Sequence, residues 1–317
     1  MSSTSNSQNT AVLLLAHGSP ESVDDIREFV RYVVGGRPVP PQTVEEIKRR
    51  YSLIGRSPLN EITMRQGKAL ERELGLPVYV GMRNWKPFIP DVVRTMSADG
   101  VARAIAICLA PQNSRTSVGL YRRAVMGESG TPFALEFIES WHDHPLLVRA
   151  FSEKLLTGWK SACRQIGSNL PVIFTVHSVP QRTITEGDPY ESQSRETAAL
   201  VAKTAGLADE DWGFAFQSQG MSGGPMSGNT WIGPTVEDMI LRWKEKGHIG
   251  VFIQPVGFLC DHVEVLYDID IGFKGFAAKR GMQLWRAESL NDSPMLIAAL
   301  ADLTRSRFTI FGERLTL

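Results

Sequence analysis

Short apolar runs alternate with longer amphipathic stretches along this chain, and this alternation restricts the folds that the chain can adopt. The apolar runs have the length of strands, and the stretches between them can form helices with one apolar face. Strands and helices that alternate in this order form parallel sheets covered by helices, so the sequence predicts an α/β fold. The predicted strands are residues 12–16, 78–82, 104–109, 172–176, 212–217 and 250–254. The predicted helices are residues 22–34, 43–51, 63–74, 89–99, 146–165, 190–205, 235–246 and 294–307.

The two halves of the chain carry a weak internal repeat. Residues 12–20 resemble residues 172–180, and each half then offers two further strands. We therefore expect two similar doubly wound, Rossmann-like lobes with parallel sheets and a cleft between them. The first lobe would be residues 11–145 and the second residues 146–317, with the last helix a candidate to pack back on the first lobe. Residues 1–10, rich in Ser and Asn, are expected to form a disordered tail.

The charge balance and the lengths of the apolar runs argue against two classes of protein. Lys and Arg together number 34, as do Asp and Glu, so the formal net charge is zero. A nucleic-acid-binding protein normally has a basic bias, and a membrane span needs about 18 apolar residues in a row. The apolar runs at residues 11–16 and 104–110 reach only strand length. We therefore expect neither a nucleic-acid partner nor an integral membrane segment.

The cysteines and the first residues of the chain indicate a cytoplasmic protein. Cys108, Cys163 and Cys260 are widely separated, which fits neither a disulfide framework nor a paired-cysteine metal site. They are expected to be small apolar core residues. Residues 1–10 lack the basic and apolar regions of a secretory signal.

Two side chains capable of proton and metal chemistry follow predicted strands. His177 ends the apolar run that begins at Val172, and Glu264 follows the run at residues 251–258. Ligands of doubly wound sheets bind at the carboxyl ends of the strands, where His17 would also lie. An imidazole and a carboxylate that meet there can accept protons and hold a divalent metal in transit.

These side chains also have ordinary structural interpretations, which the sequence leaves open. A histidine at a strand end is often a satisfied structural residue, and Asp261 with Glu264 fits a capping box at a helix start. Glu264 and Asp268, four residues apart, would share one helical face, where like charges favour a cation between them. His262 falls off that face and is expected to have a packing or supporting role.

Motifs of the common nucleotide and hydrolase sites are missing from the sequence. It has no P-loop, no G-x-G-x-x-G after a strand, no H-E-x-x-H and no G-x-S-x-G at a strand-to-helix elbow. Residues 220–230 are rich in glycine and are expected to form an irregular loop, either a lid or a surface insertion.

A series of short motifs nevertheless runs in order along nearly the whole chain. They occupy residues 13–20, 50–59, 63–66, 82–88, 109–114, 176–180, 187–190, 216–218, 231–234, 255–270 and 290–292. The longest runs from Pro255 through Asp261-His262-x-Glu264 to Asp270. Each is weak alone, but in this order they resemble the ferrochelatases, the type II chelatases that insert ferrous iron into a porphyrin.

The resemblance implies roles for individual residues. His177 would accept a pyrrole proton or ligate incoming iron, and Glu264 would receive iron or the second proton. Asp268 is a further candidate metal-binding residue. Trp85 and Trp231 are candidate walls of the porphyrin pocket, although an ordinary core position fits each equally well. The residues implied for binding the porphyrin or its propionates are Arg50, Tyr51, Ser57 and Tyr121.

The resemblance also implies the substrates. These would be Fe²⁺ and a porphyrin, with no tightly bound cofactor and, because no cysteine cluster is present, no iron–sulfur cluster. Residues 22–41 carry Arg27, Arg31 and Arg37 rather than an apolar lip. With Arg50, this segment is most like the short coproporphyrin III enzymes, whose product is Fe-coproporphyrin III (coproheme). Protoporphyrin IX, giving protohaem, is the alternative, and other haem-pathway enzymes are candidate transient partners.

Two positions depart from the pattern of these short relatives. His17 stands where they commonly have a tyrosine that ligates iron from the far side of the ring, so His17 is a candidate axial ligand. Gly272 stands where an acidic row along the metal path would continue, with Asp270 as a partial substitute. Both departures keep open a non-catalytic haem- or porphyrin-binding protein on the same scaffold. A cobalt or nickel chelatase for a more reduced tetrapyrrole is disfavoured by the match at residues 255–270.

Overall fold

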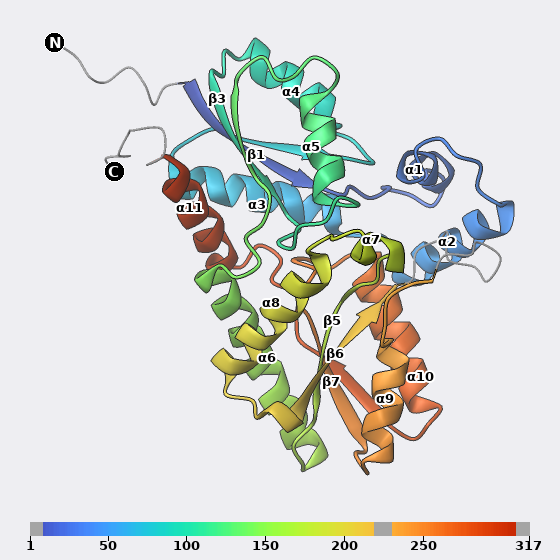
Figure 1. The fold of residues 1–317 in the computed structure, drawn as a ribbon. Coiled ribbons are helices and arrows are strands. Elements are labelled where there is room, and N and C mark those ends of the chain that lie inside the picture. The colour runs from blue at the N-terminus through green and yellow to red at the C-terminus, as the bar shows by residue number, and fades with distance from the viewer. Residues whose placement is uncertain (1–8, 219–229, 309–317) are drawn as a thin grey trace. The chain divides into compact units, whose positions relative to one another are not determined.

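The computed structural model describes residues 9–218 and 230–308, whose strands form two four-stranded parallel sheets (Figure 1). The strand order is β2-β1-β3-β4 in one sheet and β6-β5-β7-β8 in the other. In each sheet the first strand lies between the second and the third, which is the doubly wound arrangement. The predicted α/β class with two similar sheets is confirmed.

The described residues divide into two compact units, each built around one sheet. The first unit comprises residues 9–39, 58–141 and 291–308, and the second comprises residues 40–57, 142–218 and 230–290. The helix in residues 40–57 groups with the second unit because it packs against the helical segment that begins at Glu264. The first unit thus consists of three stretches of the chain, and the two stretches of the second unit lie between them in the sequence.

The first unit contains one sheet and five helices among its described residues. The strands are β1 (Thr10–Ala16), β2 (Val78–Met82), β3 (Arg103–Cys108) and β4 (Ala134–Ile138). The helices are α1 (Ile26–Val33), α3 (Leu59–Leu74), α4 (Ile89–Ala98), α5 (Val118–Met126) and α11 (Pro294–Phe308). Helices α4 and α5 pack on one face of β1 and β3, and α11 packs on α3 (Figure 1). The sequence pattern predicted neither β4 nor α5. Strand β4 is a half-exposed edge strand without a long apolar run.

Strand β1 forms the centre of the first sheet. All seven of its residues are buried, and it pairs in parallel with β2 on one side and β3 on the other. Helices cover both faces of such a strand, so it reads as one continuous apolar run rather than an alternating one. Its carboxyl end leads directly into His17.

The turn after β1 requires a glycine at position 18. Gly18 has φ +80°, and a Cβ atom there would lie 2.9 Å from both the Cβ and the backbone nitrogen of Trp85. The backbone amides of Arg83 and Asn84 donate to the carbonyls of Ala16 and His17, each at 2.9 Å. The turn after β1 and the turn after β2 are therefore packed directly against each other.

The second unit has the same strand order but different helices. Its strands are β5 (Val172–His177), β6 (Trp212–Gln217), β7 (Gly250–Pro255) and β8 (Gln283–Arg286). Its α-helices are α2 (Pro41–Ile54), α6 (Pro145–Ile166), α7 (Gln181–Thr185), α8 (Tyr190–Ala205), α9 (Val236–Glu245) and α10 (Lys274–Ala278). A 3₁₀ turn, η2 (Asp209–Asp211), and a π-helix, η3 (Glu264–Phe273), complete it. Helices α6 and α8 lie on one side of this sheet and α9 and α10 on the other (Figure 1).

The core between this sheet and helices α9, η3 and α10 consists mainly of apolar side chains. It includes Ile173 of β5, Ile253 of β7 and Val265 of η3, all fully buried. Burying each such side chain contributes about 1.5–3 kcal/mol. This core fixes η3 against the carboxyl half of the sheet, which is the half that carries the candidate site.

The π-helix η3 is the least expected element of the fold. One interpretation of the sequence placed Asp261 and Glu264 in a capping box at an ordinary helix start, but no side-chain hydrogen bond caps this helix. A π-helix is rare, and it is found most often at functional sites. The following strand, β8, was also not predicted, because it has only four residues.

The remaining expectations concern a membrane span, the predicted loop and tail, and the cysteines. Within the part of the chain that the structure describes, no helix is both long and apolar enough to cross a membrane. Residues 220–229 of the predicted loop, like most of the predicted tail, lie outside the described residues. Cys108 and Cys260 are buried as expected, whereas Cys163 is only partly buried.

Candidate active site

His177 occupies the carboxyl end of the central strand of the second sheet. It is the last residue of β5 and is in register with Gln217, the last residue of β6. Its Nδ1 is hydrogen-bonded to the carbonyl of Ser178, which directs Nε2 away from the strand. Nε2 lies 3.4 Å from Oε1 of Glu264, the first residue of the π-helix. The structure thus brings together the two residues predicted to form the catalytic pair.

Glu264 contacts a second imidazole as well. Nε2 of His262 lies 3.6 Å from Oε2 of Glu264, while its Nδ1 is 3.0 Å from the carbonyl of Cys260. The ring of Phe258 packs on His262 with a centroid distance of 4.6 Å. Residues 260–262 are not helical, so a helical projection does not apply to His262; its contacts with Phe258 and Glu264 agree with the expected packing or supporting role.

The charges of this group favour an ion pair between His177 and Glu264. Burial would lower the pKa of His177, but the Glu264 carboxylate outweighs burial and raises the pKa to about 9. Burial would raise the pKa of Glu264, yet His177 and His262 together hold this pKa well below its usual range. The His177 and Glu264 side chains remain 29% and 33% exposed, so a substrate can reach both.

Asp268 is the second acidic residue on the π-helix. Burial and the negative charge of Glu264 raise the pKa of Asp268 to about 6. The hydroxyl of Ser218 donates to one Asp268 oxygen, and Nη1 of Arg50 lies 3.4 Å from the other. Asp268 therefore carries a partly neutralised charge, and it is joined to the Glu264 site through one helix.

Helix α2 supplies the cationic side chains of the site. Nε of Arg50 donates to Glu46 at 3.0 Å, and its guanidinium lies over the Tyr267 ring, 4.9 Å from the centroid. Arg49 donates to the Tyr267 hydroxyl. Arg50 is 40% exposed, so it can also bind an anionic ligand.

The other residues predicted in the second unit differ in exposure. Tyr51 and Ser57 are buried, with 4% and 9% exposed. The Trp231 ring lies 6.3 Å from the His177 ring between centroids, at an interplanar angle of 57°. Trp231 is thus an aromatic neighbour of His177, while Tyr51 presents almost no surface.

Sequence reasoning missed several residues that position this site. The Tyr190 hydroxyl donates to the His177 carbonyl at 2.9 Å, and Gln217 donates to the Glu264 carbonyl at 3.1 Å. Ser218 has φ 55°, a left-handed conformation that is uncommon for a residue other than glycine. A usable signal existed for Gln217 and Ser218, since Gln217 ends β6 as His177 ends β5 and Ser218 follows directly.

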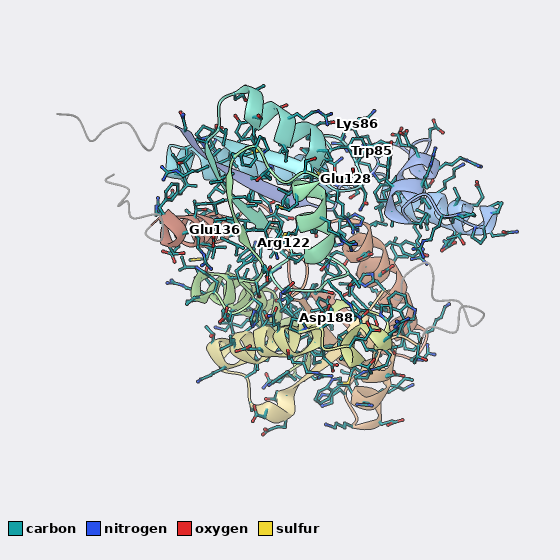
Figure 2. The ribbon with its side chains drawn as sticks, turned by 45° about the horizontal axis from the view of Figure 1, so that its top comes forward. Trp85, Lys86, Arg122, Glu128, Glu136 and Asp188 are labelled. Atoms are coloured by element: carbon teal, nitrogen blue, oxygen red, sulfur yellow. The ribbon has the colours of Figure 1, made fainter. Side chains whose placement is uncertain are left out.

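His17, Trp85 and Tyr121 belong to the first unit. Trp85 follows β2 beside Lys86, on the side of the unit where α1 lies (Figure 2). It is 4% exposed and packs on Phe29. Tyr121 is 5% exposed, with the Arg83 guanidinium 5.5 Å from its ring centroid. Both aromatic residues are therefore well packed core residues.

His17 has hydrogen-bond partners on both ring nitrogens. Nδ1 is 3.0 Å from the Gly18 carbonyl. Nε2 lies 2.9 Å from the side-chain amide of Asn84. Coordination of iron through Nε2 would replace the hydrogen bond to Asn84.

Asp270 is the last acidic residue of the π-helix. Asp270, the expected partial substitute for an acid at Gly272, instead forms two hydrogen bonds with Arg286, at 2.7 and 2.9 Å. Among residues 9–218 and 230–308, no group of three or more His, Cys, Asp or Glu side chains could hold a metal ion. The described site brings His177 and His262 to the two carboxylate oxygens of Glu264.

The fold is similar to that of solved chelatase structures. SirB from Bacillus subtilis with Fe³⁺ matches 94% of this chain and 95% of its own, with a TM-score of 0.56 and 11% sequence identity. At this identity the likeness concerns the fold alone.

The chain belongs to the ferrochelatase family, the lyases that insert iron into a porphyrin. The family model described as Ferrochelatase matches residues 9–308. The Ferrochelatase of Acidobacterium capsulatum is 53% identical over 314 residues, covering 94% of each chain. The Coproporphyrin III ferrochelatase of Geobacillus sp. (strain WCH70) is 34% identical, covering 94% of this chain and 98% of its own. The family expected from the short motifs is confirmed.

Proposed function

We propose that this protein inserts Fe²⁺ into coproporphyrin III at the His177–Glu264 pair. The main support for this proposal is the distance of 3.4 Å between His177 Nε2 and Glu264 Oε1 at the carboxyl edge of the second sheet. Insertion of a dication releases the two N–H protons of the porphyrin, so the site must both guide a cation and accept protons. A carboxylate and an imidazole in contact supply these two functions.

The two partners of this pair have complementary tasks. Glu264 is anionic and partly exposed, so it attracts Fe²⁺, and Asp268 offers a second oxygen ligand on the same helix. Once a dication neutralises Glu264, the carboxylate no longer favours the protonated form of His177. The imidazolium then releases its proton to solvent, and its Nε2 lone pair can accept a pyrrole proton or ligate the metal.

Coproporphyrin III is favoured over protoporphyrin IX by charge and by relatives. Coproporphyrin carries four propionates, and the exposed guanidinium of Arg50 lies beside Asp268 at the edge of the site. A bidentate guanidinium matches a carboxylate well. The Geobacillus relative named as a coproporphyrin III enzyme supports this choice.

The test replaces His177 and keeps the rest of the site. His177→Ala should lower the rate of Fe²⁺ insertion at least about 100-fold, because a general base is lost, while porphyrin affinity stays within about tenfold. Purified protein is incubated anaerobically with Fe²⁺ and either porphyrin, and the absorbance bands are followed. A higher kcat/KM for protoporphyrin would contradict the substrate assignment.

A matched control is available in the same unit. His248 lies just before β7, at the opposite edge of the sheet, and packs edge-to-face against Trp243 with centroids 5.2 Å apart. His248→Ala should leave insertion unchanged. If His177→Ala retains insertion, or if it binds neither porphyrin and is unfolded by circular dichroism, the proposed role of His177 is wrong.

A further inference from the structure

The guanidinium of Arg286 binds two carboxylates that flank Glu264 in the sequence. Its Nε and Nη2 atoms donate to the two oxygens of Asp270 at 2.7 and 2.9 Å. Nη2 also lies 3.2 Å from Oδ1 of Asp261, and Nη1 donates to the Ala287 carbonyl at 3.0 Å. A planar guanidinium has donors in fixed directions, so it orients the groups that it binds as well as neutralising them.

This contact is anchored on the rigid part of the second unit. Arg286 is the last residue of β8 and is in register with Ile253 of β7. Its side chain is only 15% exposed. The Ala287 amide donates to the Ile253 carbonyl at 2.9 Å, and the Ser289 hydroxyl donates to Asp261 at 2.8 Å. The guanidinium is therefore held by the edge of the sheet rather than by a loop.

The two carboxylates bracket the residues of the candidate active site. Asp261 precedes Glu264 by three positions, and Asp270 follows Asp268 by two. The intervening segment begins with a non-helical turn and continues as a π-helix, a backbone form that is rare in proteins. We expect such a segment to need contacts with residues outside it to keep one conformation. Arg286 supplies these contacts on both sides of Glu264 and Asp268.

We propose that Arg286 is a positioning residue that fixes Glu264 and Asp268 for metal insertion by binding Asp261 and Asp270 together. The inference deepens the proposed function and rests on it, since it assigns no chemistry to Arg286 itself. Without the guanidinium, the partly buried carboxylates of Asp261 and Asp270 lose their cationic partner. They belong to the same segment as the carboxylates of Glu264 and Asp268. The segment then relaxes, and the carboxylate of Glu264 leaves its position against His177.

The first test compares Arg286→Lys with Arg286→Gln. Lysine keeps the charge but is a single point donor, so it cannot reproduce the three contacts to the two aspartates. Arg286→Lys should lower kcat for Fe²⁺ insertion about 10- to 100-fold, since small displacements of a catalytic group cost that much. Arg286→Gln should lower it at least as far. The Kd for porphyrin, measured by fluorescence titration, should change less than about twofold, because the proposal assigns Arg286 no contact with the porphyrin.

The neighbouring Lys154 provides a matched control. Its ammonium binds Glu288, two residues after Arg286, at 2.8 Å, and the Glu288 side chain is 83% exposed. Lys154→Gln removes a cation from the same region without touching the segment from Asp261 to Asp270. It should leave kcat unchanged. A wild-type kcat in folded Arg286→Lys, or parallel losses of kcat and porphyrin affinity, would overturn the inference.

A second variant covers the case in which Arg286→Gln does not fold. Asp270→Asn weakens the two-donor contact from the other side, at a side chain that is 38% exposed. It should also lower kcat with porphyrin affinity retained. If both residues act through one contact, Asp270→Asn combined with Arg286→Lys should be no slower than the slower single variant. Multiplied losses would show independent effects and overturn the inference.

The two proposals fail in distinguishable ways. Full insertion by His177→Ala would refute the proposed active site, whatever the Arg286 variants do. Loss of insertion in His177→Ala together with normal insertion in folded Arg286→Lys would refute only the positioning role of Arg286.

Discussion

At the scale of single residues, the site depends on how backbone carbonyls orient two imidazoles. Nδ1 of His177 and Nδ1 of His262 each face a backbone carbonyl, so both Nε2 atoms are directed at the Glu264 carboxylate. The hydrogen bond made by one ring nitrogen determines that the other nitrogen is available to bind a proton or a metal. A carboxylate between two such nitrogens is held in place without losing its exposure to substrate.

Glu264 and Asp268 should contribute unequally to insertion. Glu264→Gln removes the charge that attracts the metal and pairs with His177, so kcat/KM for Fe²⁺ should fall at least about 100-fold. Asp268→Asn should reduce it less than about tenfold, because Ser218 and Arg50 already offset part of its charge. Anaerobic initial rates over a range of Fe²⁺ concentrations measure both effects.

Glu191 of α8 gives the control for these carboxamide substitutions. Its carboxylate pairs with Arg195 on the same helix at 2.8 Å. Glu191→Gln should retain wild-type rates. Equal losses in the Glu264 and Asp268 variants would contradict the assignment of the primary role to Glu264.

His17 remains a candidate axial ligand that spectroscopy can test. Coordination through Nε2 must replace its hydrogen bond with Asn84. In His17→Ala, the absorption spectrum of the bound iron-porphyrin product should change, because the field at the iron changes when an imidazole ligand is lost. An unaltered spectrum would rule out coordination by His17.

At the scale of elements, helix α9 has a complete N-terminal cap. Thr235 accepts from the Asp238 amide at 3.1 Å, and the Asp238 carboxylate accepts from the Thr235 amide at 2.9 Å. This capping box begins the helix that covers the apolar face of the second sheet. It satisfies amides that have no partner within the helix.

Replacing Thr235 with alanine should therefore destabilise the protein by a small, defined amount. The free energy of unfolding should fall by about 1 kcal/mol, the usual cost of losing such a cap. Denaturant titration followed by circular dichroism measures it. Thr235→Ser keeps the hydroxyl and should be close to wild type, and a similar loss in both variants would contradict the capping role.

At the scale of the whole molecule, the first unit is completed by the last helix of the described chain. Helix α11 packs on α3, and Arg65 of α3 binds Asp292 just before α11 at 2.8 Å. Arg305 of α11 binds Glu73 of α3 at 3.0 Å. The unit built around β1 thus depends on residues almost three hundred positions further along the chain.

Leu300 tests this dependence. It is fully buried on α11, so Leu300→Ala should lower the free energy of unfolding by about 2–5 kcal/mol. Met64 of α3 is 41% exposed, and Met64→Ala should cost much less. A Leu300→Ala protein with wild-type stability in denaturant titration would show that α11 is not part of the cooperative core.

The sequence by itself determined the α/β class, the central strands and the strand-end position of His177. These follow from local periodicity and from the rule that ligands lie at the carboxyl ends of parallel strands. Only the tertiary structure decided that His262 faces Glu264, that Ser218 and Arg50 share Asp268, and that Arg286 binds Asp270. Those contacts join side chains through sheet order, a π-helix and irregular turns, none of which has a periodic signature in the sequence. Hydrophobic patterning specifies which strands form, whereas packing over long separations determines which polar groups meet.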